Sequence, residues 1–309
     1  MYLDYLKNNQ EKISYSDFML ACIESTNEFN TEIFNIQKNF IMAAEGASEV
    51  LSVVAEKIKA FFRAIGKFLR TIISKFKSFI SAIIDKVRAL FLKIRQRMSS
   101  AKEAVEEVRN EDKFYVDVSH ALTNICTRGS SLSDPSYIML MISGFNRERT
   151  DDSCKEEFEK IMKAYTQYMN DVRNIIERQI VVYRVTFMNL DKHCEGMVNK
   201  QLEYIKEKID NMEKNLKFFE TNQEVAATVK HYEKDQEWTK RYLSMVREYK
   251  KYSELFIKIS SYICRAIYSL LLNGTKKYEN KADAEKARDE LRDTLLSHIA
   301  SINFVEKYG

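Results

Sequence analysis

The sequence predicts an all-α fold, an elongated helical bundle with long antiparallel helices and one long basic amphipathic helix. Among its 309 residues are one Pro and seven Gly, the residue types that break helices and form tight turns. Charged residues make up 30 % of the chain and apolar residues 45 %, a mixture typical of helical bundles. Apolar residues recur every three or four positions along most of the chain, and no strand-like alternation or glycine-rich phosphate-binding motif is visible.

Three parts are expected along the chain. Residues 1–46 read as an N-terminal helical leader, in which residues 3–41 form one or two short helices. The small residues "AAEGAS" at 43–48 indicate a joint, because nothing large is available there to pack. Residues 47–110 then form the long basic amphipathic helix, and residues 111–309 form a helical bundle with a coiled-coil-like hairpin.

Local signals place the elements of the third part. A short helix over 112–129 is expected to end at Gly129. Asp134 as N-cap and Pro135 in the first helical position open the next helix. Near the C-terminus, Gly274 ends a helix, and Asn280 or Asp283 opens a last one that runs to about Val305.

The hairpin is predicted from a seven-residue repeat of apolar residues between Val198 and Phe219, the pattern of a coiled-coil seam. A capping-box pattern at Thr221 and Glu224 indicates that the chain turns there. We therefore expect helices over 153–220 and 223–272 to pack antiparallel, with Ile205 near Tyr242.

The positive charge of the chain is concentrated in one segment. Residues 54–97 hold twelve basic residues against Glu56 and Asp85, a net charge of +10. Because the whole chain is +4, the remainder is −6. One helix therefore carries the whole positive excess.

The same segment carries an apolar stripe in which the spacing of three and four residues repeats every eleven. Such a repeat keeps the stripe on one side of a nearly straight helix. The stripe is formed by Val54, Ile58, Phe61, Ile65, Leu69, Ile72, Phe76, Ile80, Ile83, Val87, Phe91 and Ile94. It is widened to about 130° by Phe62, Phe68, Ile73, Phe79, Ile84 and Leu90. We predict one continuous helix over 50–98, with Gly66 as its weak point.

Something must cover this stripe, and three alternatives stay open: the protein's own core, a second copy of the chain, or a bilayer. Basic residues beside a wide apolar stripe suit anionic lipid headgroups, and the same charges suit the DNA backbone without reading base sequence. The residues predicted to contact a membrane or nucleic acid are Lys57, Lys59, Phe61, Arg63, Lys67, Phe68, Arg70, Lys75, Phe76, Lys77, Lys86, Arg88, Phe91, Lys93, Arg95 and Arg97. Buried phenylalanines would favour the protein's own core, and exposed ones a membrane.

No catalytic or metal-binding constellation is visible. His193, Cys194 and Glu195 are adjacent, so on a helix their side chains point about 100° apart and do not converge. The five cysteines are scattered and never in a CxxC spacing, which argues against a zinc site or disulfide framework. We expect no enzymatic activity, no cofactor and no small-molecule substrate.

The N-terminus lacks the continuous apolar core of a secretory signal. The longest run of low charge, residues 259–275, is shorter than the roughly 20 apolar residues of a spanning helix and reads as a buried helix.

The first hundred residues resemble internal virion proteins of large tailed bacteriophages. The likeness rests on a helical leader that opens with "YLDYLKNNQEKI", then "MAAEG", then the basic amphipathic helix. In that family a prohead protease removes the leader after a Glu, which here implies a cut between Glu45 and Gly46. The resemblance also implies that the protein is packaged beside the genome, in the virion interior or the host cytoplasm.

Two functions follow as hypotheses. In the first, the chain is a non-enzymatic phage structural protein that engages a membrane or anionic polymer through residues 50–98. In the second, it is a soluble helical protein–protein interaction module that buries the amphipathic helix in its own core. Self-association is a possible partner interaction under either.

Overall fold

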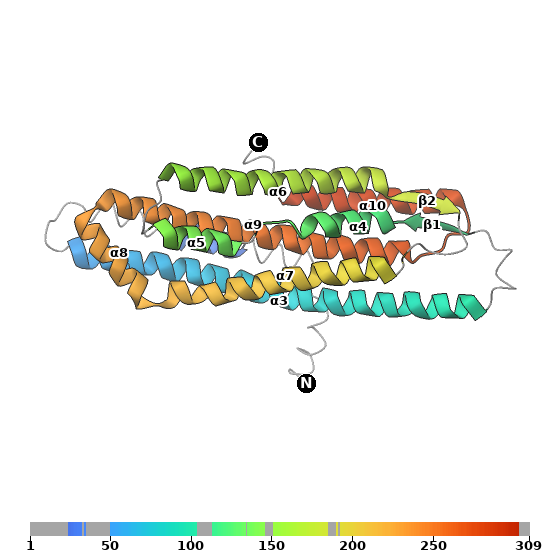
Figure 1. Cartoon of the computed structure of the whole chain (residues 1–309), viewed down its shortest axis with the longest axis horizontal. Coiled ribbons are helices and arrows are strands. Elements are labelled where there is room, and N and C mark those ends of the chain that lie inside the picture. Colours follow the sequence, from blue (N-terminus) through green and yellow to red (C-terminus); the bar gives the residue numbers. More distant parts are fainter. Residues whose placement is uncertain are drawn as a thin grey trace, which may run out of the picture. The chain divides into compact units, whose positions relative to one another are not determined.

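The computed structural model describes residues 24–32, 34, 50–103, 113–133, 135–145, 151–184, 190 and 192–302. Helices dominate these residues and confirm the predicted all-α class (Figure 1). An N-terminal helix covers residues 24–32 and 34. The other elements are α3 (Val50–Glu103), β1 (Phe114–Asp117), α4 (Ser119–Gly129), α5 (Pro135–Phe145), α6 (Asp151–Gln179), β2 (Val181–Arg184), α7 (Lys192–Glu220), α8 (Asn222–Lys234), α9 (Gln236–Gly274) and α10 (Lys281–Ser301).

The chain forms two compact units, each assembled from separate stretches. Unit 1 comprises the described parts of residues 1–79, 134–159 and 207–258. Unit 2 comprises those of residues 80–133, 160–206 and 259–309. The helices α3, α6, α7 and α9 are each continuous and contribute residues to both units. The predicted division follows chain order, whereas each unit draws on more than one of the predicted parts.

Helix α3 is continuous from Val50 to Glu103, which confirms the single helix predicted over 50–98. Its stripe faces the protein interior: each of the twelve stripe residues is buried, and Ile65, Phe76 and Val87 are fully so. Of the six residues that widen the stripe, only Leu90 is half-exposed rather than buried. Burial of each large side chain stabilises the fold by roughly 1.5–3 kcal/mol. The stripe therefore contributes far more free energy to folding than an exposed ion pair does.

Gly66 is the point at which α3 and α7 approach closely in unit 1. A Cβ added at Gly66 would lie 3.1 Å from Cβ of Phe219. Phe219 is buried, with its ring centroid 6.3 Å from Phe62 and 5.7 Å from Tyr249, on which it stacks. Phe219 therefore has little room to move. Because Gly66 has no Cβ, it allows α7 to pack closely against α3, and this contact offsets its low helix propensity.

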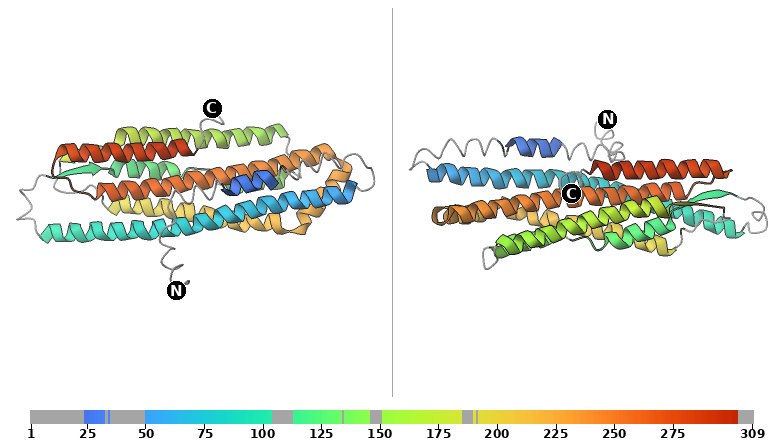
Figure 2. Two further views of the ribbon diagram at one scale, coloured as in Figure 1. Left: turned by 180° about the vertical axis from the view of Figure 1, so that it is seen from behind. Right: turned by 90° about the horizontal axis from the view of Figure 1, so that it is seen from above.

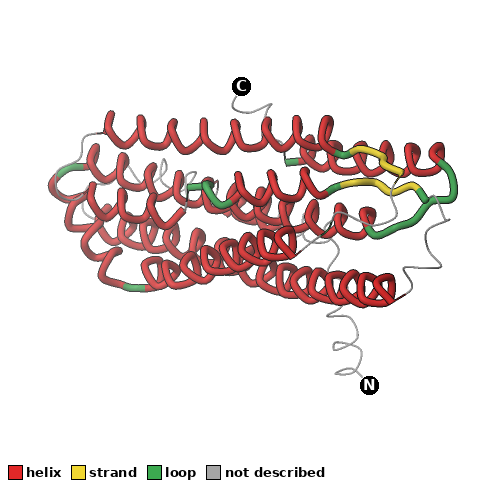
Figure 3. The backbone as a smooth tube through the Cα atoms, turned by 45° about the vertical axis from the view of Figure 1, so that its right-hand side comes forward, coloured by secondary structure: helices red, strands yellow, loops and turns green. Residues whose placement is uncertain are grey.

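Among the described residues the structure contains one small sheet that no alternation in the sequence indicates. In unit 2, β1 and β2 pair antiparallel, with Tyr115 opposite Tyr183 (Figure 3). Phe114 also exchanges two backbone hydrogen bonds of 3.0 Å with Tyr278. The helix predicted over 112–129 is therefore a strand followed by α4. Asp117 begins α4 by accepting bonds from the backbone N–H and hydroxyl of Ser119 at 2.9 and 2.7 Å.

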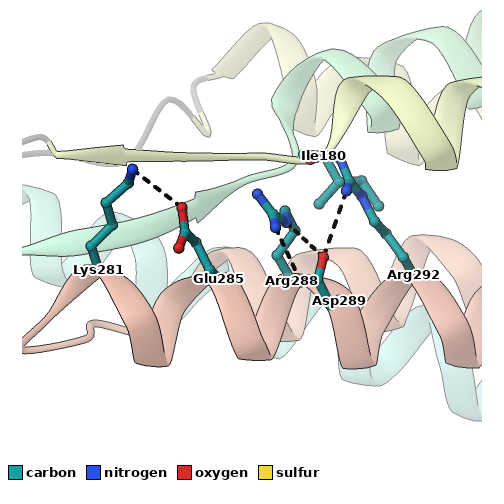
Figure 4. Close-up of polar contacts among 6 residues, drawn as sticks. All are labelled: Ile180, Lys281, Glu285, Arg288, Asp289 and Arg292. Carbon is teal, nitrogen blue, oxygen red and sulfur yellow. Dashed lines mark hydrogen bonds and ion pairs between the residues drawn. The ribbon is translucent and has the colours of Figure 1, made fainter.

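The helix predicted over 153–220 is interrupted after Gln179, and β2 and residue 190 precede α7. The run of Ile180, Val181 and Val182 explains the break, since β-branched residues favour extended backbone. The carbonyl of Ile180, which leaves the helix, accepts a 2.5 Å bond from Nη2 of Arg292 on α10 (Figure 4). Figure 4 also shows Arg292 beside Asp289, which holds Arg288 through two bonds.

The second half of the predicted hairpin is also divided, because α8 and α9 meet at Asp235. Asp235 accepts the backbone N–H of Trp238 at 2.9 Å and so starts α9. This break shifts the pairing of α7 with α9 in unit 1. Asn215 donates to the hydroxyl of Tyr249 at 3.4 Å, whereas Tyr242 bonds to Glu224 of α8. Within unit 1, Tyr249 therefore bonds to α7 and Tyr242 to α8, whereas the predicted pair of Ile205 and Tyr242 falls in different units and stays a prediction.

Several predicted ends are confirmed. Helix α4 ends at Gly129, α5 begins at Pro135 and α9 ends at Gly274. Asn280 caps α10 by accepting the N–H of Asp283 at 2.9 Å. Thr221 does precede α8, but its hydroxyl bonds back to Phe218 and makes no cap.

Some predictions lie outside the described residues. These are the joint at 43–48, the proposed cut between Glu45 and Gly46, the side chain of Arg97, the cap at Asp134 and the end near Val305.

We expect Gly66→Ala to lower the free energy of unfolding by about 1 kcal/mol, because the strain against Phe219 exceeds the gain in helix propensity. The matched control is Gly196→Ala on α7, where an added Cβ meets nothing within 4 Å. That change should raise stability by about 0.5–1 kcal/mol. Urea unfolding of both variants checks the prediction, and equal stabilisation by both would contradict the close crossing.

Candidate functional site

The predicted contact surface is the basic face of α3, and the structure pairs much of it with acidic residues of α7. In unit 2, Nη2 of Arg95 lies 2.9 Å from a carboxylate oxygen of Glu195. Nη2 of Arg88 lies 3.7 Å from Glu203. Arg88 and Arg95 are therefore occupied within the protein.

The same pairing occurs in unit 1. Nζ of Lys77 lies 2.8 Å from Asp210 and 2.7 Å from Glu213, and Arg70 forms an ion pair with Glu220. Hydrogen bonds from Lys77 to the two carboxylates raise the pKa of Lys77 above its ordinary value of 10.5. The charged form of this lysine is therefore favoured by the fold.

In each unit the residue number falls along α3 as it rises along α7, so the two helices run antiparallel, side by side in Figure 1. We call these contacts the α3–α7 ion-pair ladder. Its acidic members are Glu195, Glu203, Asp210, Glu213 and Glu220, and none of them was predicted as a site residue from the sequence. The available signal was the net charge of −6 outside the basic segment.

The four phenylalanines predicted to insert into a membrane are all buried. Phe61 and Phe68 are 4 % exposed, Phe91 is 2 % exposed and Phe76 is fully buried. The guanidinium of Arg247 lies 5.4 Å from the ring centroid of Phe61. In this fold the four rings are therefore core residues and offer no membrane-contact surface.

The remaining basic residues of the predicted site differ in their partners and in their exposure. Lys59 pairs with Glu56 on its own helix at 3.6 Å, Lys67 lies 3.9 Å from Glu28, and Lys86 lies 5.8 Å from the ring of Tyr268. Desolvation lowers the pKa of Lys57, which is half-buried.

Arg63 and Lys93 are exposed and Lys75 is half-buried. Across the part of the chain that the structure describes, these three form no ion pair. They are the basic side chains of α3 that remain available to an outside anion.

The chain matches no protein-family model, no curated protein and no solved structure. What the basic face does must therefore follow from its own geometry.

A second charged cluster lies in unit 1, where α9 meets the N-terminal helix. Glu254 accepts hydrogen bonds from Lys250 at 2.9 Å, Lys258 at 2.7 Å and the hydroxyl of Thr26 at 3.0 Å. Nζ of Lys250 also lies 4.1 Å from the ring centroid of Phe68. Burial raises the pKa of Glu254, but the charges and hydrogen bonds of Lys258 and Lys250 outweigh it, and the pKa lies below its ordinary value.

The residues considered for chemistry do not converge. Cys194 is buried, His193 is exposed, and Glu195 belongs to the ladder. Burial raises the pKa of the Cys126 and Cys264 thiols, so both stay protonated and are poor nucleophiles. Among the described residues no group of three or more His, Cys, Asp or Glu side chains is placed to hold a metal ion.

Helix α9 is the one described helix that is long and apolar enough to cross a membrane. Within its apolar window 72 % of the residues are buried inside the protein, as the core helix of a bundle would be. The run at 259–275 thus lies in a buried helix, as predicted, although α9 begins much earlier, at Gln236.

Reversing the charge of Lys77 tests the ladder. We expect Lys77→Glu to lower the free energy of unfolding by about 1–2 kcal/mol, since a pair worth up to about 1 kcal/mol is replaced by repulsion from Asp210 and Glu213. Lys75→Glu is the matched control, because Lys75 makes no ion pair in the described chain, and it should cost less.

Adding Asp210→Lys and Glu213→Lys to Lys77→Glu should restore most of the lost stability. High salt should shrink the difference between Lys77→Glu and Lys75→Glu, because exposed pairs are screened. A cost for Lys77→Glu that is independent of salt in urea unfolding would contradict an ionic ladder.

Glu254→Gln should lower the free energy of unfolding by about 3 kcal/mol at neutral pH, because Lys250 is left buried without its counter-charge. The lowered pKa of Glu254 means that its stabilisation is present above the ordinary value of 4.5 and is lost as pH falls through the folded value. The gap between the two proteins should therefore close in acid. Lys250→Met combined with Glu254→Gln should recover much of the loss, and acid unfolding curves provide the measurement.

Proposed function

We propose that this protein is a non-enzymatic helical interaction module in which the apolar side of α3 belongs to the core and is not the contact surface. The observation that carries the proposal is the burial of Phe61, Phe68, Phe76 and Phe91. A helix used as a membrane surface needs its apolar side free, and here that side packs inside both units.

The charge of α3 supports the same function. Arg70, Lys77, Arg88 and Arg95 are matched by acidic partners on α7, so four of the basic residues that would have met lipid phosphates or DNA are used within the chain. Neutralisation by exposed ion pairs contributes little energy, but it reduces the positive field that the sequence suggests.

Exposed apolar residues are the contact points that such a module offers. Tyr137 and Leu140 of α5 are 41 % and 70 % exposed and lie one turn apart. Helix α5 carries no charged residue over its eleven positions. A surface helix of this composition is suited to contact with another protein.

A second candidate is an internal virion protein that holds an anionic polymer or headgroup surface without sequence preference. The observation in its favour is that Arg63, Lys75 and Lys93 form no ion pair among the described residues. On this hypothesis the basic residues act without the phenylalanines, so binding would be electrostatic and would fall steeply between about 50 and 200 mM salt.

Vesicle binding separates the two. We expect the intact chain not to bind anionic vesicles at physiological salt, and an excised peptide of residues 50–98 to bind them and become helical, because its stripe has lost its cover. Co-sedimentation and circular dichroism provide the measurements. The module would be contradicted by vesicle binding of the intact chain that persists in salt and is abolished by a crosslink between Arg88→Cys and Glu203→Cys. This crosslink ties α3 to α7, so its effect would show that binding requires α3 to leave α7.

Changing Phe61, Phe68, Phe76 and Phe91 together to Ser gives different outcomes in the two settings. In the peptide the change should remove vesicle binding that persists in salt and leave the charge unchanged. In the intact chain it should prevent folding, since each lost ring in a core costs about 3–5 kcal/mol. A folded intact variant would show that these rings are not core residues.

A further inference from the structure

The N-terminal helix sits in a groove on unit 1, dark blue beside α3 in Figure 2. Its Ser25, Glu28, Phe29 and Glu32 face Ala64, Lys67, Phe68 and Thr71 of α3 across a small gap. Lys250 and Glu254 of α9 form the other wall, through contacts to Phe29 and Thr26. The groove is thus built by two helices and filled by a third.

The groove recognises a short, well-defined set of side chains. The ring of Phe29 lies 5.5 Å from Phe68, and Nζ of Lys250 lies 4.5 Å from the Phe29 centroid and 4.1 Å from that of Phe68. A lysine between two aromatic faces makes favourable cation–π contacts with both. The Thr26 hydroxyl meets the Glu254 carboxylate at 3.0 Å, and this contact fixes the helix along the groove.

The attachment of the helix is slight compared with that of the long helices. Ser25 and Phe29 are its buried residues among those described. Its ion pair from Glu28 to Lys67 is long at 3.9 Å and exposed on both sides. Phe34, at its far end, is 63 % exposed. A helix this short is not stable alone in water, so it is ordered by whichever groove holds it.

Fifteen residues, 35–49, join this helix to Val50 of α3. If extended, a connection of this length spans up to about 50 Å, so the helix of one copy can reach the groove of any copy that lies within that distance. A second copy brings the same Thr26, Phe29 and Glu28, so every contact in the groove is reproduced. Exchange of the N-terminal helix between two copies therefore loses no groove contact, and the exchanged fraction rises with protein concentration.

We propose that this groove is a helix-docking site whose partner is the N-terminal helix of a second copy of the chain, exchanged for the chain's own. The proposal goes beyond the core role of α3 and rests on it, because Phe68 of the packed α3 forms part of the groove. It gives the module a self-association mode built from Phe68, Lys250 and Glu254.

Crosslinking of full-length chains tests the exchange. Glu28 and Lys67 are exposed and face each other across the groove, so each is changed to Cys in a Cys22→Ser background. The other four cysteines are buried. With a short bis-maleimide, a chain that carries both Glu28→Cys and Lys67→Cys should crosslink within itself in dilute solution and also between chains in concentrated solution. A mixture of the two single variants should give a covalent dimer whose yield rises with concentration.

Two controls make the result specific. Lys75→Cys in place of Lys67→Cys lies two turns away on α3 and should give no dimer above collision. Phe29→Ser in the Glu28→Cys chain should lower the dimer yield at least about tenfold, because the ring that fills the groove is gone, and Thr26→Ala serves if that variant folds poorly. The proposal is overturned if the mixture yields no more dimer than the Lys75→Cys control, or if the double variant crosslinks neither within nor between chains.

Discussion

The apolar stripe of α3 is the constraint on which the rest of the structure depends. Eighteen large side chains on one helix must be covered, and burial at roughly 1.5–3 kcal/mol each far exceeds the zero to about 1 kcal/mol of an exposed ion pair. The stripe is too wide for one neighbour. Phe62 meets Phe218 and Phe219 of α7, Phe68 meets the N-terminal helix, and Phe61 meets Arg247 of α9. A wide stripe therefore selects a bundle and not a two-stranded coiled coil.

Apolar burial does not by itself choose a register, since sliding α7 by one turn would bury similar side chains. The ion-pair ladder supplies that choice, because a one-turn slip would cost Lys77 one of its two carboxylates, Asp210 or Glu213. Gly66 adds a steric condition, because Phe219 fits closely against it. The large energy thus comes from the stripe, whereas the small and directional contacts determine which of several similar packings is formed.

The sequence was sufficient to predict α3, because an eleven-residue pattern over twelve stripe positions is a long and redundant signal. Ends marked by local chemistry, such as Pro135 and the Asn280 cap, were predictable for the same reason. The strands were missed because four residues give almost no periodicity, and β1 is stabilised by β2 and Tyr278, which are distant in sequence. The break at Ile180 likewise depends on Arg292 of α10. Tertiary contacts decided the strands, and at Ile180 they add to the local preference of β-branched residues for extended backbone.

The same reasoning explains why the site was predicted only in part. The basic residues were found, but their partners were not, since which face of α7 meets α3 depends on packing. The partner residues were therefore not visible from the sequence.

The pairing of α3 with α7 decides whether α3 could leave the bundle for a membrane. Moving the stripe of α3 from core to lipid exchanges one apolar surrounding for another, so this part of the free energy nearly cancels. Headgroups offer about 1 kcal/mol per basic residue, against which the ladder pairs are lost. The deciding cost falls on the partners: Phe219, Leu216 and Met212 of α7, now buried, would lose their cover. Release of α3 alone is therefore unfavourable, and only opening of the whole bundle, with α7 and α9 also reaching an apolar surface, would make a membrane state accessible.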